Sequence, residues 1–197
     1  MGIYLGKQLK QLDKPDAHNT QKTTLQAAAK VVSFLWPDFV SEKEMVLLAN
    51  HAGSNACSSG TTTDWECFIN HTHIFDEFGD NSGAVRQTTV SLSDGIDGIE
   101  VTYDEMHPDF IAACELGKNA AKLWAVKLSL DFPHEAYRVY YTQYDNPVVR
   151  FHKVRLQEPP YLSDEAIRAA AGDLKNALVY DTRHLASPIS ASQISIH

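Results

Sequence analysis

One long apolar stripe, between Pro108 and Pro133, constrains the fold of this chain more than any other feature. Apolar side chains recur there with the spacing of a helix, at Phe110, Ile111, Cys114, Ala121, Trp124 and Leu128. Pro108 suits the first turn of a helix, and the Asp131-Phe132-Pro133 step ends the run. We therefore predict a long helix in this segment that forms the centre of the core.

Several other segments have the composition of β-strands, being rich in aromatic and β-branched residues. They are Glu66–Phe75, Val85–Leu92, Ile99–Tyr103, Tyr137–Tyr144 and Val148–Leu156. Two Asp-Gly steps within residues 93–98 and the Asp145-Asn146-Pro147 step place tight turns between strands that are neighbours in the sequence. Short turns join antiparallel strands, so the sequence predicts hairpins at both places.

Three further segments are predicted as helices. Gln21–Leu35 carries apolar residues at helical spacing and is followed by a proline. Ser41-Glu42-Lys43-Glu44 matches a capping box, which predicts a short helix over Glu42–Asn50. Ser163 precedes two acidic residues, as is typical of a helix start, and this last helix is expected to run to about Val179.

The order of these elements indicates an α+β protein: a mostly antiparallel sheet of about five strands with helices packed on one face. The alternative is a curved sheet around a conical cavity, as in the nuclear-transport-factor-like fold, which also begins with helices. We expect residues 1–19 to form a loose leader, residues 20–180 a single domain and residues 181–197 a flexible tail.

Composition predicts a cytoplasmic protein without a membrane partner. With 197 residues, 44% of them hydrophobic, the chain can bury a core without disulfides. Its three cysteines, Cys57, Cys67 and Cys114, have no Cys-x-x-Cys spacing, which favours a reducing compartment. Neither a signal peptide nor a run of roughly 18 apolar residues occurs. The oligomeric state stays open, and a homo-oligomer is compatible with the sequence.

Negative charge is concentrated in one part of the chain. The formal net charge is −8, and residues 61–109 contain eleven acidic side chains but a single basic one, Arg86. Such a segment attracts cations and repels the phosphates of nucleic acids. We therefore expect no nucleic-acid partner, although most of these carboxylates are also compatible with ordinary solvated surface.

A His-x-His-x-x-x-Glu spacing, formed by His71, His73 and Glu77, is the strongest candidate for chemistry. On a strand, residues two apart point to the same face, so two imidazoles and a nearby carboxylate can bind one divalent metal. Asp76 is an alternative carboxylate ligand. Candidates for a third histidine ligand are His107, His134 and His152. Equally, the histidines can be structural residues on a half-buried strand.

The same residues resemble the first metal-binding box of the cupins, in which two histidines and a glutamate hold Fe, Mn, Zn or Ni. The resemblance covers about a dozen residues. The chain lacks the glycine expected shortly before the histidines and a second box with a Pro-x-Gly step, and the predicted helices differ from a pure β-barrel. The resemblance therefore implies a divalent transition metal (Zn, Fe or Mn) but not membership of that family.

Two other constellations contain parts of a functional site. Arg138 and Arg150 stand among tyrosines in the carboxy-terminal hairpin and are predicted to bind a small anionic substrate, or to pair with the acidic segment. Cys57 or Cys67, with a nearby histidine, contains the parts of a thiol hydrolase, although buried and unreactive cysteine is the alternative.

Two functional hypotheses follow from these motifs. The first is a single-metal-dependent enzyme that acts on a small anionic substrate, with His71, His73 and Glu77 on the metal and Arg150 and Arg138 on the substrate. The second is a non-catalytic ligand-binding or protein-interaction domain in which the histidines are structural. The presence of a metal distinguishes them.

Overall fold

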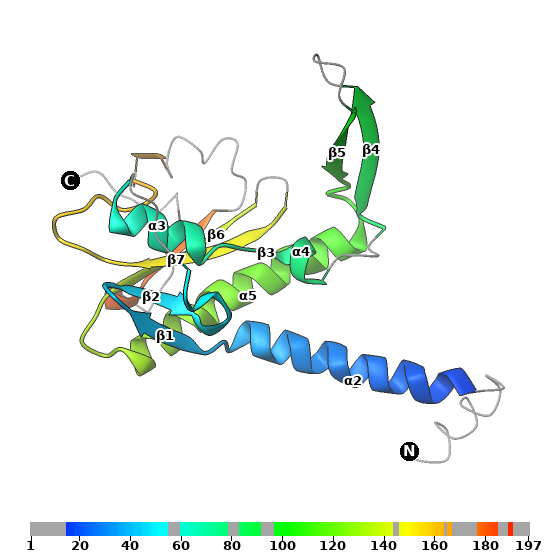
Figure 1. Ribbon diagram of the computed structural model, residues 1–197, viewed down its shortest axis with the longest axis horizontal. Helices are drawn as coiled ribbons and strands as arrows, with labels where there is room; N and C mark the ends of the chain where they lie inside the picture. The colour runs from blue at the N-terminus through cyan, green and yellow to red at the C-terminus, as the bar shows by residue number, and fades with distance from the viewer. Residues whose placement is uncertain are drawn as a thin grey trace. The chain divides into compact units, whose positions relative to one another are not determined.

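A computed structural model of the protein describes residues 15–54, 60–78, 83–91, 97–143, 146–163, 165–166, 177–184 and 189–190. The chain divides into two compact units, Met1–Trp36 and Pro37–His197. The first unit contains helix α2 (Pro15–Leu35), which includes the predicted helix Gln21–Leu35 (Figure 1). The second unit contains the remaining elements.

The second unit combines helices with antiparallel strands, so the protein is α+β. Its helices are α3 (Thr62–Ile69), α4 (Ile74–Phe78) and α5 (Pro108–Asp131), and its 3-10 turns are η1 (Ala49–His51) and η2 (Thr182–His184). Its strands are β1 (Phe39–Glu42), β2 (Met45–Leu48), β3 (Thr72–His73), β4 (Val85–Ser91), β5 (Asp97–Tyr103), β6 (Tyr137–Thr142), β7 (Val148–Lys153), β8 (Leu178–Asp181) and β9 (Ile189–Ser190). Each strand pairing in the described part of the chain is antiparallel.

Strands β6 and β7 form the centre of the main sheet, whose order is β3-β7-β6-β8-β9. Val139 pairs with Phe151, so both side chains point to the face on which α5 lies, and Phe151 contacts Trp124 there. Tyr140 points to the opposite face and packs against Cys67 of α3. Helices therefore cover both faces of β6 and β7. The prediction of helices on one face was wrong because β6 carries buried aromatic side chains on both of its faces.

Helix α5 forms the core, as predicted. The Trp124 side chain is only 1% exposed, and its ring packs edge-on against Phe39 and Phe151, with centroids 6.4 and 6.1 Å away. Near the start of the helix, Phe110 stacks on Phe75 of α4. The apolar stripe of α5 therefore packs against β7 of the main sheet, against β1 and against α4.

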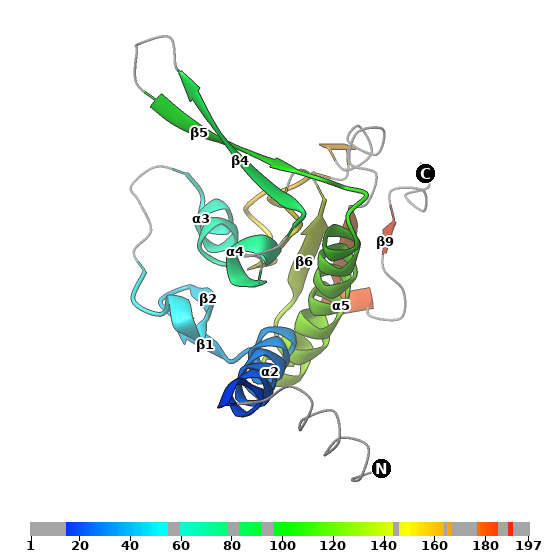
Figure 2. The same ribbon diagram turned by 90° about the vertical axis from the view of Figure 1, so that its right-hand side faces the viewer.

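Strands β4 and β5 form the predicted hairpin, but they stand apart from the main sheet. They pair with each other over seven residue pairs, from Val85–Tyr103 to Ser91–Asp97. Figures 1 and 2 both show this ribbon extending away from β6. The predicted sheet of about five strands combined the ribbon with the carboxy-terminal hairpin, whereas the structure has them in separate sheets.

The segment after α2 is a hairpin, β1–β2, so the helix predicted over Glu42–Asn50 was wrong. All four side chains of β2 are buried, a pattern that a half-exposed helix cannot produce. Lys43 takes a positive φ of 57° in the turn, which breaks any helix at that residue. The apparent capping box is therefore a β-turn.

The strand predicted over Glu66–Phe75 was also wrong. Residues Thr62–Ile69 form α3, which begins with a capping box in which the Thr61 hydroxyl and the Asp64 carboxylate each satisfy a backbone amide. The short strand β3 follows, and then α4. Glu66, Cys67 and Asn70 are all buried, which reflects a helix packed between the sheet and β2 rather than an edge strand.

The carboxy-terminal helix predicted after Ser163 lies largely outside the described residues. The Ser163 hydroxyl does accept a hydrogen bond from the Ala166 amide (3.0 Å), as an N-cap would. Leu178–Asp181 then forms β8 beside β6, an unpredicted strand. Among the described residues, the search for a helix long and apolar enough to cross a membrane found none.

Candidate functional site

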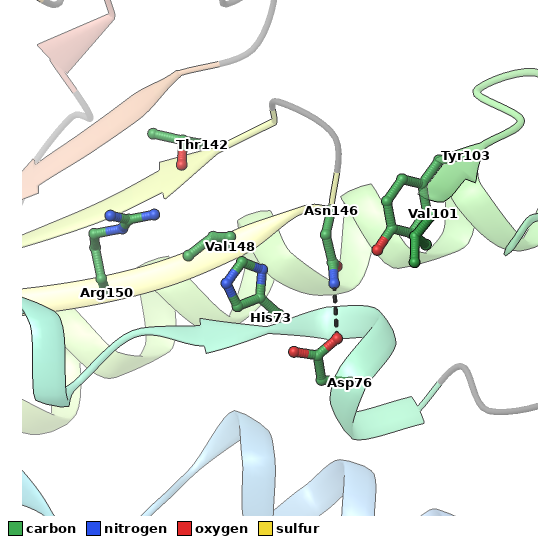
Figure 3. Close-up of a pocket in the computed structure, with 8 residues that line it drawn as sticks. All are labelled: His73, Asp76, Val101, Tyr103, Thr142, Asn146, Val148 and Arg150. Atoms are coloured by element: carbon green, nitrogen blue, oxygen red, sulfur yellow. Dashed lines mark hydrogen bonds between the residues drawn. The ribbon is translucent and has the colours of Figure 1, made fainter. Parts of the chain in front are cut away.

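A pocket of about 540 Å³ lies where β3, β6 and β7 meet α4 and the base of the β4–β5 ribbon. Figure 3 shows its lining side chains, which are His73, Asp76, Val101, Tyr103, Thr142, Asn146, Val148 and Arg150. The pocket has the size of a small-molecule site and combines apolar walls with a few polar groups. Of the residues predicted for a site, it contains His73 and Arg150, together with the alternative ligand Asp76.

The register of β7 sets the order of the polar groups along the pocket. His73 pairs with Val148, so both side chains lie on one face of the sheet. Arg150 lies two residues further along β7 on that face, and Asn146 lies two residues before Val148. At about 3.3 Å per residue, Arg150 and Asn146 are roughly 13 Å apart along the strand. Arg150 therefore marks one end of the pocket, and His73 lies between the two.

Arg150 is held by Tyr161, and one of its other donors has no partner in the ranges that the structure describes. Its Nη1 donates to the Tyr161 hydroxyl (3.0 Å), and its guanidinium carbon lies 5.4 Å from the centre of the Tyr161 ring. The Nε–H is buried and has no hydrogen-bond partner among the described residues. A buried and unsatisfied guanidinium donor is unfavourable unless a ligand or water accepts from it.

His73 is the second polar group with an unused nitrogen. Its Nδ1 is buried and, within the described part of the chain, has no hydrogen-bond partner. Burial lowers the pKa of His73, and the nearby Arg150 charge lowers it further, whereas Asp76 acts in the opposite direction. The imidazole is therefore neutral at pH 7 and offers a donor or an acceptor but no charge.

The far end of the pocket is built on Asn146 and Asp76. Asn146 Nδ2 donates to the Asp76 carboxylate (3.0 Å), and its Oδ1 accepts from the Phe75 amide (3.1 Å). The buried Asn146 thus ties α4 to the turn before β7. The Asp76 carboxylate presents an acceptor there. Glu77 also lies on α4 but is not among the residues that line the pocket.

The two histidines of the His-x-His motif are neighbours, but only His73 belongs to β3. Their rings are 5.1 Å apart and perpendicular. His71 Nδ1 contacts the Phe68 carbonyl oxygen, so it carries the proton and leaves Nε2 with its lone pair. In the residues that the structure describes, no group of three or more His, Cys, Asp or Glu side chains is arranged to hold a metal ion.

The other residues predicted for a site lie elsewhere. Arg138 forms an ion pair with Asp181 of β8 (3.5 Å), so it connects the neighbouring strands β6 and β8. His152 is buried and accepts from the Tyr140 hydroxyl (2.9 Å). His107 caps α5, and His134 lies in the turn after that helix. None of these four residues lines the pocket.

The structure gives no support to a thiol site at Cys67. This cysteine is completely buried, and its burial raises the pKa of the thiol well above the ordinary range. The thiol is therefore protonated at neutral pH and packs against Tyr140. Cys57, the alternative nucleophile, lies outside the described residues.

Several residues that line the pocket or support it were not predicted from the sequence. Asn146 precedes a proline, and the sequence predicted only a turn at this position. Val101 and Tyr103 belong to a hairpin that the sequence placed in the main sheet. A signal for Tyr161 was absent, because its contact with Arg150 depends on how the chain returns after β7.

The chain was compared with known proteins in three ways. No family model, no curated protein and no solved structure matches it. The fold and the pocket therefore define it as an α+β protein with a candidate small-molecule site.

Proposed function

We propose that this protein binds a small anionic molecule in the pocket, with Arg150 as the anchor for the negative charge. The observation that carries this proposal is the buried Arg150 Nε–H, which has no hydrogen-bond partner among the described residues. A carboxylate or phosphate oxygen would satisfy it and would form a charge-assisted hydrogen bond. Tyr161 holds the guanidinium in place, so little side-chain entropy is lost on binding.

The remaining polar groups limit what the anion can carry. His73 is neutral, and its Nδ1 has no partner in the described part of the chain, so it offers a hydrogen bond to the middle of the ligand. Asp76 would repel a second negative charge and accepts from a donor such as a hydroxyl or amide. The pocket therefore suits a molecule with a single anionic end, which lies at Arg150 and away from Asp76.

Anion titrations of three proteins test this proposal: the unmodified chain, Arg150→Gln and Arg86→Gln. The Arg86 side chain is 71% exposed, so its replacement makes the same charge change away from the pocket. Loss of a charge-assisted hydrogen bond should weaken carboxylate binding about 10- to 100-fold in Arg150→Gln and by less than about twofold in Arg86→Gln. Equal affinities of the two variants, or no binding to the unmodified chain, would overturn the proposal.

A second candidate function is favoured by the orientation of His71. Its Nδ1–H donates to the Phe68 carbonyl, and metal-bound histidines commonly make such a bond, which leaves Nε2 as the ligand. With His73 5.1 Å away, and Asp76 or Glu77 as carboxylate, the site would hold Zn, Fe or Mn and leave coordination positions for the anion. The protein would then be a metal-dependent enzyme.

Elemental analysis separates the two candidates. A metal site predicts close to one equivalent of transition metal in protein prepared without chelators, and loss of most of it in His73→Gln. His134→Gln, a change at an exposed histidine, should retain the metal. Less than about a tenth of an equivalent, with no uptake of added Zn, Fe or Mn, would exclude the metal-dependent enzyme and leave the binding domain.

A further inference from the structure

One face of the β4–β5 ribbon continues outward from the pocket and is uncharged from Tyr103 to Ile99. Tyr103 and Val101 line the pocket, and Ile99 lies two residues further along the same face of β5. Val101 is 42% exposed and Ile99 is 69% exposed. Exposed apolar side chains in a row beside a pocket are characteristic of a ligand-binding surface.

Among the described residues of the ribbon, charged side chains are absent from the part of this face that adjoins the pocket. The β4 partners of Tyr103, Val101 and Ile99 are uncharged and share their face: Val85, Gln87 and Thr89. The opposite face carries Arg86 and Glu100. In the register of the face next to the pocket a charged residue first occurs at Asp97, beyond Ile99, so the stretch from Tyr103 to Ile99 is the part suited to apolar contact.

The lining of the pocket changes from charged at one end to aromatic and apolar at the other. Figure 3 shows the charged anchor, Arg150, at one end and Tyr103 at the other. At that end, the centre of the Tyr103 ring lies 5.3 Å from that of Phe75 of α4. Val101 and then Ile99 extend that end over roughly 13 Å of strand. A molecule that reaches from Arg150 to Ile99 must be elongated, charged at one end and apolar at the other.

We propose that the ligand is an amphiphilic anion, a carboxylate whose charged end binds Arg150 and whose aliphatic or aromatic tail lies on Tyr103, Val101 and Ile99. This inference rests on the proposed function and names the substrate class of the same pocket. Tail binding removes the exposed apolar surface of Val101 and Ile99 from water. Each tail methylene that becomes fully buried should strengthen binding, up to about fourfold.

The test is a series of straight-chain carboxylates from acetate to hexadecanoate, titrated calorimetrically below their micelle concentrations, because only the longer chains reach from Arg150 past Tyr103. Affinity should rise with chain length in the unmodified protein. In Ile99→Asn, a change outside the residues that line the pocket, affinity should rise much less over the longest chains, while acetate binding stays within about twofold of the unmodified chain. Thr102→Asn is the matched control, because it lies on β5 but on the charged face, and it should keep the full dependence.

The outcomes separate this inference from the proposed function. If short and long carboxylates bind equally well and Arg150→Gln weakens both, the anion site stands and the amphiphilic ligand is excluded. If no carboxylate binds, both proposals fail. Should octanol bind as tightly as octanoate, or Ile99→Asn change the oligomeric state and not the chain-length dependence, the ribbon face has another role and this inference is wrong.

Discussion

Glu66 and Arg155 form a buried ion pair that joins three elements of the fold. Arg155 Nη1 donates to Glu66 Oε2 (2.7 Å), and the Glu66 side chain is completely shielded from solvent. The same carboxylate accepts from the Val46 amide of β2 (2.7 Å) and the Lys153 amide of β7 (2.8 Å). One side chain of α3 thus accepts hydrogen bonds from backbone amides of two strands and from a guanidinium.

Removal of the Glu66 carboxylate should therefore be severe. In Glu66→Ala, Arg155 loses its carboxylate partner and keeps only neutral acceptors in the described part of the chain, and two backbone amides lose their acceptor, so we expect a loss of about 3–5 kcal/mol in the free energy of unfolding. Glu115→Ala is the control, because Glu115 pairs with Lys118 on an exposed part of α5 and should contribute less than about 0.5 kcal/mol. Urea denaturation of both variants checks this, and similar small losses would contradict it.

His152 should make the protein less stable in mild acid. Burial, and then the charges of Arg138 and Arg155, lower the pKa of His152 to about 4, from an ordinary value near 6.5. Its Nδ1–H donates to the Lys153 carbonyl, so Nε2 accepts from Tyr140 and cannot take a proton without losing that bond. Between pH 6.5 and 4 the unfolded chain binds a proton that the folded chain does not. Stability should fall by up to about 3 kcal/mol as the pH drops through this window.

Denaturant unfolding at a series of pH values from 7 to 4.5 measures this effect. His152→Gln should be less stable at pH 7 but should have a shallower decline, because the titrating group is gone. His134→Gln, an exposed histidine, should decline as steeply as the unmodified chain. If all three proteins decline in parallel, His152 is not the group responsible.

The sequence predicted those elements whose local pattern agrees with their tertiary environment. Helix α5 was predicted because its apolar spacing and Pro108 agree, and the β4–β5 hairpin because its turn and strand patterns agree. Predictions failed where buried polar residues interact over long distances. The segment Glu66–Phe75 was predicted as a strand, yet it begins in α3, where Glu66 and Asn70 hydrogen-bond to the backbone of β2, 20 to 24 positions away.

The candidate site could be predicted only in part for a related reason. His73 and Arg150 carry recognisable chemistry and were identified from their residue types. Their association depends on the pairing of β3 with β7, which two residue pairs define and which no local pattern reveals. The apolar wall at Val101 could not be predicted, because the sequence does not determine where a hairpin lies relative to a sheet.

The substitution Lys43→Gly, in the turn between β1 and β2, should change stability in opposite directions in a hairpin and in a helix. Lys43 has a φ of 57°, a conformation that costs a non-glycine residue roughly 1–2 kcal/mol. Lys43→Gly should therefore leave stability unchanged or raise it by up to about 1 kcal/mol. In a helix the same change would cost about 1 kcal/mol, as we expect for Lys122→Gly in α5. Thermal unfolding of both variants decides between the two structures.

Gly117 should tolerate no side chain, because a buried ring lies against it. A Cβ at this position would be 2.7 Å from Tyr141 Cε2, and the Tyr141 side chain is completely buried. Glycine-to-alanine changes inside a helix normally stabilise by roughly 1 kcal/mol, but overpacking costs about 1–3 kcal/mol. We expect Gly117→Ala to lower the free energy of unfolding by about 1–2 kcal/mol, measured in urea.

A double-mutant cycle identifies the ring as the cause of that loss. Tyr141→Leu removes the ring atoms that the new methyl group would strike, although the substitution is itself destabilising. In the Tyr141→Leu background, Gly117→Ala should become neutral or stabilising, because only the gain in helix propensity remains. If Gly117→Ala destabilises both backgrounds equally, the close packing of α5 on β6 is not the reason for this glycine, and the position of the helix on the sheet is wrong.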